Sequence, residues 1–232
     1  MRYLFIIFCT FYLSSSCYSQ NRLWISSEIK TNIFNDDFRV QAALQGRFYD
    51  HGRYDKIFPE LSMQYEVTKW LKPSMDYRFI FNQSRTSYER STGHRLNFNL
   101  NTDFDYERFD FQFRARYQYS FATYSADTGY DPDFDNALRF KPKIKYDIKG
   151  SKIDPLIESE WFYNTNYGEF GKQFVKYRFA VGVDINLPKK HELSIKYRYD
   201  YEFNVPNPWR SHVLSLGHSH EYERDSYKVD GL

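Results

Sequence analysis

The chain has 232 residues, of which 21% are aromatic, while 27% carry a charge and the mean hydropathy is −0.73. So many aromatic side chains in so polar a chain must be separated from the charged ones in space, because mixing them would bury charges beside apolar rings. The formal net charge of +2 argues against a dedicated nucleic-acid surface, and the length suits one domain.

The first twenty residues have the layout of a secretory signal peptide, with Arg2 before an apolar run at 3–13 and a small polar stretch that ends at Gln20. The apolar run is shorter than the ~20 residues that a membrane-spanning helix needs. We therefore expect residues 1–20 to be cleaved during export and residues 21–232 to form a single β-barrel domain. No later stretch is apolar enough for a helical span, so any membrane crossing must be made by strands.

Both cysteines, Cys9 and Cys17, lie in this leader. The mature chain is therefore expected to have no thiol for a disulfide, a metal site or a nucleophile. Cys17 follows a Leu and three Ser residues, which leaves lipidation of that cysteine as the alternative to cleavage after it.

Alternate residues of the remaining sequence separate into an apolar and a polar series, which is the period of a strand with two unlike faces. In the clearest segment, Phe98 and Leu100 belong to the apolar series, while Asn97 and Asn99 belong to the polar one. Short turns join most strands into hairpins. In chain order, the sequence predicts a pair of strands at 23–33 and 38–48, hairpins at 57–82, 95–121, 138–163 and 175–203, and a last strand at 211–222.

Longer connections rich in Asp, Asn, Gly, Ser and Tyr separate the hairpins, at 82–93, 122–133, 164–171 and 204–210. Short turns therefore alternate with long loops, which is the asymmetry of outer-membrane barrels. Apolar stripes of about 11 residues at about 3.4 Å each, tilted about 45°, give roughly 26 Å of height, which matches the apolar band of that membrane. Strands of soluble proteins are commonly about half as long.

We predict an all-β fold, a single antiparallel up-and-down transmembrane β-barrel of about 10–12 strands, in the outer membrane of a Gram-negative bacterium. The predicted strands are odd in number, whereas bacterial single-chain barrels have an even number, so either the segment at 23–33 lies outside the wall or a strand has been missed. The alternative is a soluble barrel that turns the same apolar face inward around a ligand. The abundance of Tyr and Phe favours the membrane, where such side chains form interfacial girdles.

The polar series carries nearly all charges of the strands, and it would face the lumen because a base facing lipid at mid-depth costs about 2–4 kcal/mol. We expect these acids and bases to pair across a narrow lumen, and a polar conduit with charged rings is the alternative. A run of bases from Arg139 to Lys145 is a candidate anion-lining stripe, which Glu158 and Glu160 on the next strand would neutralise. The candidate lumen-lining residues are Arg78, Arg114, Arg116, Arg139, Lys141, Lys143, Arg178, Arg198, Glu158, Glu160, Asp184 and Asp200.

His218, Ser219, His220 and Glu221 form the candidate catalytic cluster, because a hydrolase places a Ser beside a His. Alternation puts Ser219 and Glu221 on the face opposite to the two His residues, so they cannot meet within one strand. His212 shares the His face, which is a weak indication of a metal site. The acidic stretch 127–133 lacks the spacing and terminal Glu of a calcium loop, so we expect it to be a solvated extracellular loop. We therefore predict no enzyme activity, no metal and no cofactor.

The chain resembles a family of bacterial outer-membrane β-barrels catalogued as domain of unknown function 2490. Four short motifs carry the resemblance: an aromatic strand opening with Trp24, an Arg ending the second strand at Arg47, the triplet Tyr77-Arg78-Phe79, and Asn-Ala-Leu-Arg-Phe at 136–140. The resemblance covers essentially the whole mature chain. It implies a barrel in the outer membrane, and it supplies no activity and no catalytic residue to carry over.

We expect a structural role or passive, porin-like passage of small polar solutes. The alternatives are a membrane-embedded lipid hydrolase and a soluble ligand-binding barrel. The expected partners are outer-membrane lipid and lipopolysaccharide, with the barrel-assembly machinery during biogenesis and no nucleic acid. The sequence specifies neither a solute nor an oligomeric state.

Overall fold

The computed structural model describes residues 20–33, 37–49, 52–83, 90–121, 132–133, 135–206 and 208–222. Residues 1–19 of the predicted signal peptide lie outside this part of the chain, so cleavage and lipidation stay predictions. Most of the acidic stretch 127–133 also lies outside it. Within the described residues, no helix is long and apolar enough to cross a membrane.

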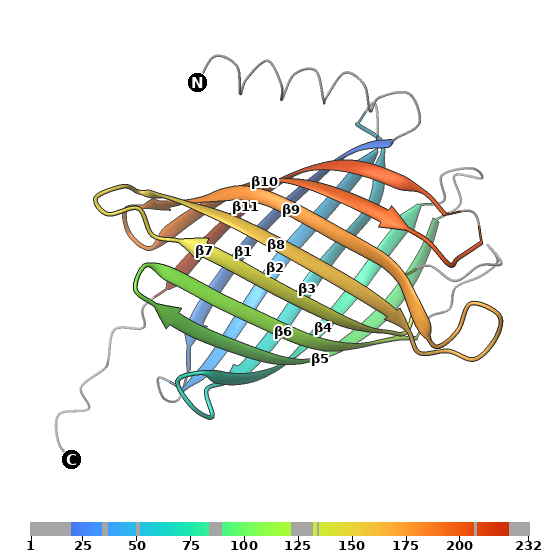
Figure 1. The fold of residues 1–232 in the computed structure, drawn as a ribbon, viewed down its shortest axis with the longest axis horizontal. Coiled ribbons are helices and arrows are strands. Elements are labelled where there is room, and N and C mark those ends of the chain that lie inside the picture. Colours follow the sequence, from blue (N-terminus) through green and yellow to red (C-terminus); the bar gives the residue numbers. More distant parts are fainter. Residues whose placement is uncertain are drawn as a thin grey trace.

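Eleven strands form a closed barrel in which each strand lies beside its neighbours in the chain (Figure 1). The predicted all-β barrel is confirmed, and the number of described strands lies within the predicted range. The strands are β1 (Gln20–Asn32), β2 (Phe38–Tyr49), β3 (Tyr54–Tyr65), β4 (Leu71–Gln83), β5 (Arg90–Tyr106), β6 (Phe109–Phe121), β7 (Ala137–Tyr146), β8 (Ile153–Asn164), β9 (Gln173–Leu187), β10 (His191–Glu202) and β11 (Arg210–Tyr222).

β1 closes the barrel by pairing with both β2 and β11, so the segment at 23–33 belongs to the wall. All other neighbouring pairs are antiparallel, but β1 and β11 are parallel, with Trp24 opposite Ser215. This closure corrects the purely antiparallel prediction. When strand direction alternates along the chain and the strands are odd in number, the first and the last strand must run the same way.

The connections at 122–136, 165–172 and 203–209, all at one end of the barrel, are longer than any at the other end, as predicted, whereas those at 50–53 and 84–89 are short. β1 begins at the long-loop end, and β11 ends at the short-turn end. In the turn between β9 and β10, Lys189 and Lys190 have positive φ angles of 59° and 56°, as tight hairpin turns require. The short-turn end carries the connections at 33–37, 66–70, 107–108, 147–152 and 188–190, and the long-loop end carries those at 50–53, 84–89, 122–136, 165–172 and 203–209.

β5 is longer than its apolar pattern predicts, because it begins at Arg90 rather than at Arg95. Residues 90–93 pair with residues 80–83 of β4, so the predicted loop at 82–93 shortens to 84–89. The backbone ladder continues past the apolar stripe because its hydrogen bonds do not depend on the side chains.

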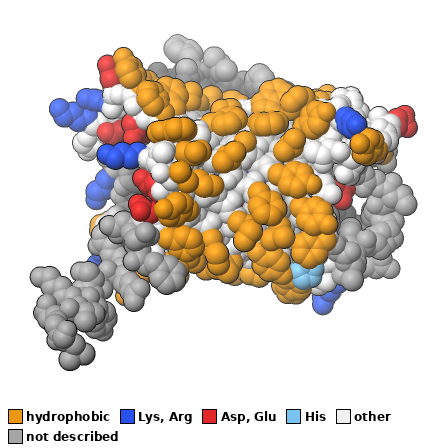
Figure 2. Space-filling model, turned by 90° about the horizontal axis from the view of Figure 1, so that it is seen from below, with side chains coloured by type: hydrophobic (Ala, Val, Ile, Leu, Met, Phe, Trp, Pro, Cys, Tyr) orange, Lys and Arg blue, Asp and Glu red, His pale blue; other side chains and the backbone are white. Residues whose placement is uncertain are grey.

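The apolar series faces outward and the polar series faces the lumen. Among the described residues, 36 large hydrophobic side chains are exposed, whereas eleven hydrophobic and 25 polar or charged residues are buried. Figure 2 shows the exposed hydrophobic side chains spread across the middle of the wall, with charged side chains toward the two ends. In β5, Phe98 is 47% exposed and its neighbour Asn99 is 5% exposed. Water-soluble proteins have the reverse arrangement, with an apolar interior.

Candidate functional site in the barrel lumen

The twelve predicted lumen residues all lie on the inner face of the wall, because each belongs to the polar series of its strand. Each of the twelve forms at least one ion pair. The inner face of the barrel therefore carries a network of paired charges rather than an apolar core. These pairs join strands one or two positions apart along the wall, so the expectation that the charges pair across the lumen is wrong for them.

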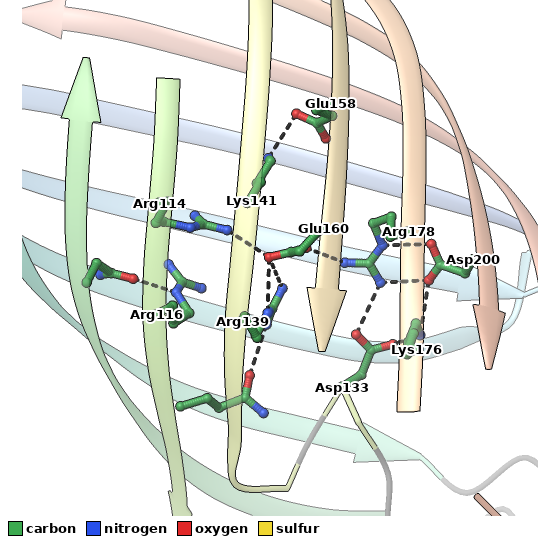
Figure 3. Close-up of polar contacts among 12 residues, drawn as sticks. Arg114, Arg116, Asp133, Arg139, Lys141, Glu158, Glu160, Lys176, Arg178 and Asp200 are labelled. Carbon is green, nitrogen blue, oxygen red and sulfur yellow. Dashed lines mark hydrogen bonds and ion pairs between the residues drawn. The ribbon is translucent and has the colours of Figure 1, made fainter. Parts of the chain in front are cut away.

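Glu160 on β8 is the centre of this network (Figure 3). It accepts hydrogen bonds from Arg114 of β6 at 3.0 Å, from Arg139 of β7 at 2.8 Å and from Arg178 of β9 at 3.2 Å. Hydrogen bonds between ionised partners are stronger than neutral ones. One carboxylate thus ties together four consecutive strands.

Arg178 and Lys176 of β9 form a second cluster beside Glu160. Arg178 binds Asp200 of β10 with two nearly parallel hydrogen bonds of 2.7 and 2.6 Å. The ammonium of Lys176 lies 3.1 Å from Asp200 and 3.3 Å from Glu202. These side chains are buried, and their opposite charges compensate for the lost hydration.

Asp133 enters this second cluster from the connection between β6 and β7 (Figure 3). Its carboxylate oxygens lie 2.7 Å from Lys176 and 3.1 Å from Arg178, and it is only 4% exposed. Burial by itself raises the pKa of Asp133, but Lys176 and Arg178 lower it well below its usual range. The prediction of a solvated loop is therefore wrong for Asp133, because the buried cations of β9 attract it into the lumen.

Aromatic rings cover cationic side chains in the long-loop half of the lumen. The Arg47 guanidinium lies 4.1 Å from the ring centroid of Trp24 and 5.3 Å from that of Phe58. Arg22 stacks in the same way on Trp209, at 3.9 Å. Such cation–π contacts explain why a few aromatic side chains face inward, against the general alternation.

A cavity of about 370 Å³ occupies the lumen from mid-height toward the short-turn end. Its described lining includes nine Arg or Lys side chains and four Asp or Glu side chains. Gln41, Gln64 and Asn101 add neutral polar groups on the short-turn side, and Trp24 and Arg47 bound the cavity toward the long-loop end.

The predicted anion-lining stripe on β7 is neutralised by the two strands that follow it. Three of its bases pair with acids on β8 or β9: Arg139 with Glu160 at 2.8 Å, Lys141 with Glu158 at 2.9 Å, and Lys143 with Asp184 at 3.5 Å. The stripe therefore belongs to the ion-pair network.

The candidate catalytic pair does not come together on β11, because Ser219 is buried on the inner face. His218 instead meets Ser27 of β1, with 3.2 Å between Ser27 Oγ and His218 Nδ1, and its Nε2 lies 3.0 Å from Nδ1 of His191. The sequence pattern missed this contact because it crosses the parallel β1–β11 seam. Among the described residues, no carboxylate is hydrogen-bonded to His218, and no group of three or more His, Cys, Asp or Glu side chains is placed to hold a metal ion.

The motifs noted in the sequence converge in the lumen, because Trp24, Arg47, Arg78 and Arg139 are all buried there. A comparison with curated proteins finds no match. The family model for proteins of unknown function designated DUF2490 matches residues 21–212, which span the wall from β1 into β11. The chain therefore belongs to the DUF2490 family.

Proposed function

We propose that this protein is an integral outer-membrane β-barrel of a Gram-negative bacterium, exported behind its signal peptide and structural in role. The observation that carries the proposal is the outward apolar surface, with 36 exposed large hydrophobic side chains among the described residues. Water-soluble proteins rarely expose large contiguous apolar patches, whereas lipid acyl chains solvate such a surface. A soluble ligand-binding barrel requires the opposite arrangement of the two faces.

The dimensions of the wall and its aromatic side chains support the same location. A strand of 12 residues such as β8, tilted about 45°, spans roughly 29 Å. Phe109 and Tyr146 pack with ring centroids 4.9 Å apart at the short-turn end, and Tyr163 and Phe174 pack at 5.4 Å at the long-loop end. Aromatic pairs at both ends fit the two interfacial girdles of a membrane barrel.

The filled lumen supports a structural role over an open pore. Glu160, Arg178 and Asp200 join β6 to β10 along one side of the inner wall, and Asp133 links Arg178 of β9 to Arg95 of β5 at the long-loop end. We expect the partners to be outer-membrane lipid and lipopolysaccharide, with the barrel-assembly machinery during biogenesis. Passive, porin-like passage of small polar solutes is the alternative role, and it requires a water path past Asp133 and Arg178.

Cell fractionation tests the location. The mature protein should remain in the outer-membrane fraction after a urea wash, dissolve only in detergent and migrate differently on gels before and after heating. Protease added to intact cells should cut only long loops. Recovery of the mature protein in a detergent-free periplasmic fraction would contradict the proposal.

Planar-bilayer recording tests the structural role. The purified barrel should give no steady conductance, because Asp133 and the buried side chains of Arg95 and Arg178 that bind it fill the long-loop half of the lumen. Steady conductance of the unmodified protein would replace the structural role by passive passage, while the barrel and its location would stand.

A hydrolase on the outer wall is a second candidate, favoured by the contact between Ser27 and His218. His218 is placed to accept the Ser27 proton, and His191 is placed to orient the His218 ring. In that case Ser27→Ala abolishes phospholipid hydrolysis by the purified protein, whereas Ser219→Ala, on the lumen face, leaves it unchanged. Equal lipid turnover in the unmodified protein and the Ser27→Ala variant excludes this candidate.

A further inference from the structure

Arg47 is a buried cation without a counter-charge in contact. It is 7% exposed, its Nε has no hydrogen-bond partner, and among the described residues no carboxylate forms an ion pair with it. The rings of Trp24 and Phe58 cover the guanidinium but do not neutralise it. Asp133 and Asp55 act on the Arg47 charge at a distance but do not contact it, so its burial is only partly compensated and the site favours an additional anion.

Three other residues that line the same cavity also carry an unused donor. Trp24 Nε1, Arg114 Nε and Arg198 Nε are buried and have no hydrogen-bond partner among the described residues. With Arg47 they bring four unused N–H groups from β1, β2, β6 and β10 to one space. Water in the cavity accepts such hydrogen bonds but leaves Arg47 unneutralised, whereas an oxyanion satisfies both needs.

The charges around the cavity also favour an anion. Nine basic and four acidic side chains line it. Three of these acids are already engaged: Glu60 with Arg78, Asp76 with Arg116, and Glu160 with Arg139. Glu158, which pairs with Arg198, is not part of the lining. The bases therefore face the cavity in excess of the acids.

We propose that this cavity binds a small oxyanion bearing phosphate or carboxylate groups, with Arg47 and Trp24 as its principal ligands. A volume of about 370 Å³ lies within the range of small-molecule sites. Gln41 and Gln64 supply neutral hydrogen-bonding groups for the rest of the ligand. Access is from the short-turn end, where the Arg39 side chain is 36% exposed, because buried ion pairs of Arg178 and Asp133 lie on the other side.

Isothermal titration calorimetry on the folded barrel in non-ionic detergent tests this site, with inorganic phosphate in one arm, citrate in a second and uncharged glucose in a third. We expect saturable binding of at least one anion and none of glucose. Arg47→Gln should weaken that binding about 10- to 100-fold, the loss of one charge-assisted hydrogen bond. Lys143→Gln is the matched control, because it removes the same charge from a lumen side chain outside the cavity lining and should leave binding unchanged.

Trp24→Phe separates binding from folding, because it keeps a ring over Arg47 and removes the Nε1 donor. It should weaken anion binding while the heat-dependent gel mobility of the barrel stays the same. Saturable binding in one arm alone assigns the ligand as a phosphate or as a carboxylate. The proposal is overturned if neither anion binds saturably, or if Lys143→Gln weakens binding as much as Arg47→Gln. Both results are independent of the location, which the fractionation tests.

Discussion

Replacement of Glu160 by Gln removes the one negative charge that Arg114, Arg139 and Arg178 share at 3.0, 2.8 and 3.2 Å. Gln has nearly the same shape as Glu, so packing is kept while three guanidinium groups lose a counter-charge. Arg178 retains Asp133 and Asp200, but among the described residues Arg139 has no other ion pair and is buried. Removal of one partner of a buried ion pair costs about 3–5 kcal/mol, and we expect a loss of that size in the free energy of unfolding.

Urea-induced unfolding of the lipid-embedded barrel, followed by tryptophan fluorescence, measures this loss. Asp103→Asn is the matched control, because it breaks a pair with Lys72 at 3.1 Å whose side chains are 35% and 22% exposed. Exposed pairs contribute about 0–1 kcal/mol, so the control should change little. A loss for Glu160→Gln no larger than that of Asp103→Asn would refute the role of Glu160 as the centre of the lumen network.

Three further perturbations test the wall, the connection that carries Asp133 and one turn. Leu100 is 53% exposed on the wall, and Leu100→Arg should lower the free energy of unfolding in a lipid bilayer by about 2–4 kcal/mol. The control Leu100→Phe should fold into vesicles like the unmodified protein, and equal folding of both variants would count against a lipid-facing wall. Lys176 and Arg178 hold the pKa of Asp133 well below its usual range. The stabilisation from these ion pairs is therefore complete above the unfolded-state pKa of about 3.9, and it is lost only as the pH falls through the lower pKa of the folded state. Proteolysis of its connection should therefore be the same from about pH 8 down to about pH 5, and a rise within that window contradicts the ion pairing. Lys190→Gly removes the strain of a positive φ of 56° and should raise the free energy of unfolding by up to about 1 kcal/mol. Urea-induced unfolding measures this free energy, and a lower value for the variant would contradict the turn geometry.

The face on which each strand residue lies could be predicted from the sequence, because the side-chain period of a strand is two. Phe98 and Asn99 fall on the predicted faces, and so do all twelve predicted lumen residues. The pairing of Glu158 and Glu160 with bases of β7 also followed, because β7 and β8 form a hairpin with adjacent inner faces.

The contacts that could not be predicted join parts of the chain far apart in sequence. Asp133 folds back into the lumen from a connection, and Ser27 meets His218 across the β1–β11 seam. The alternation of apolar and polar residues predicts the face on which a side chain lies, but it does not predict which strand or connection will lie beside that side chain. Neither contact could therefore be predicted from it. The cations that cover the ring of Trp24 likewise come from other strands, chiefly Arg47 of β2 and Arg178 of β9.

Residues 98 and 99 provide the most direct measurement of the central claim, that the apolar face contacts lipid and the charged face encloses the lumen. Single cysteines at these positions, in a mature chain expected to lack others, can carry a fluorescent label in the vesicle-embedded barrel. A quencher attached to lipid acyl chains should quench the label at position 98 strongly and the label at position 99 weakly, because Phe98 is exposed on the wall and Asn99 is buried in the lumen. Equal quenching at both positions, or stronger quenching at position 99, would contradict the account.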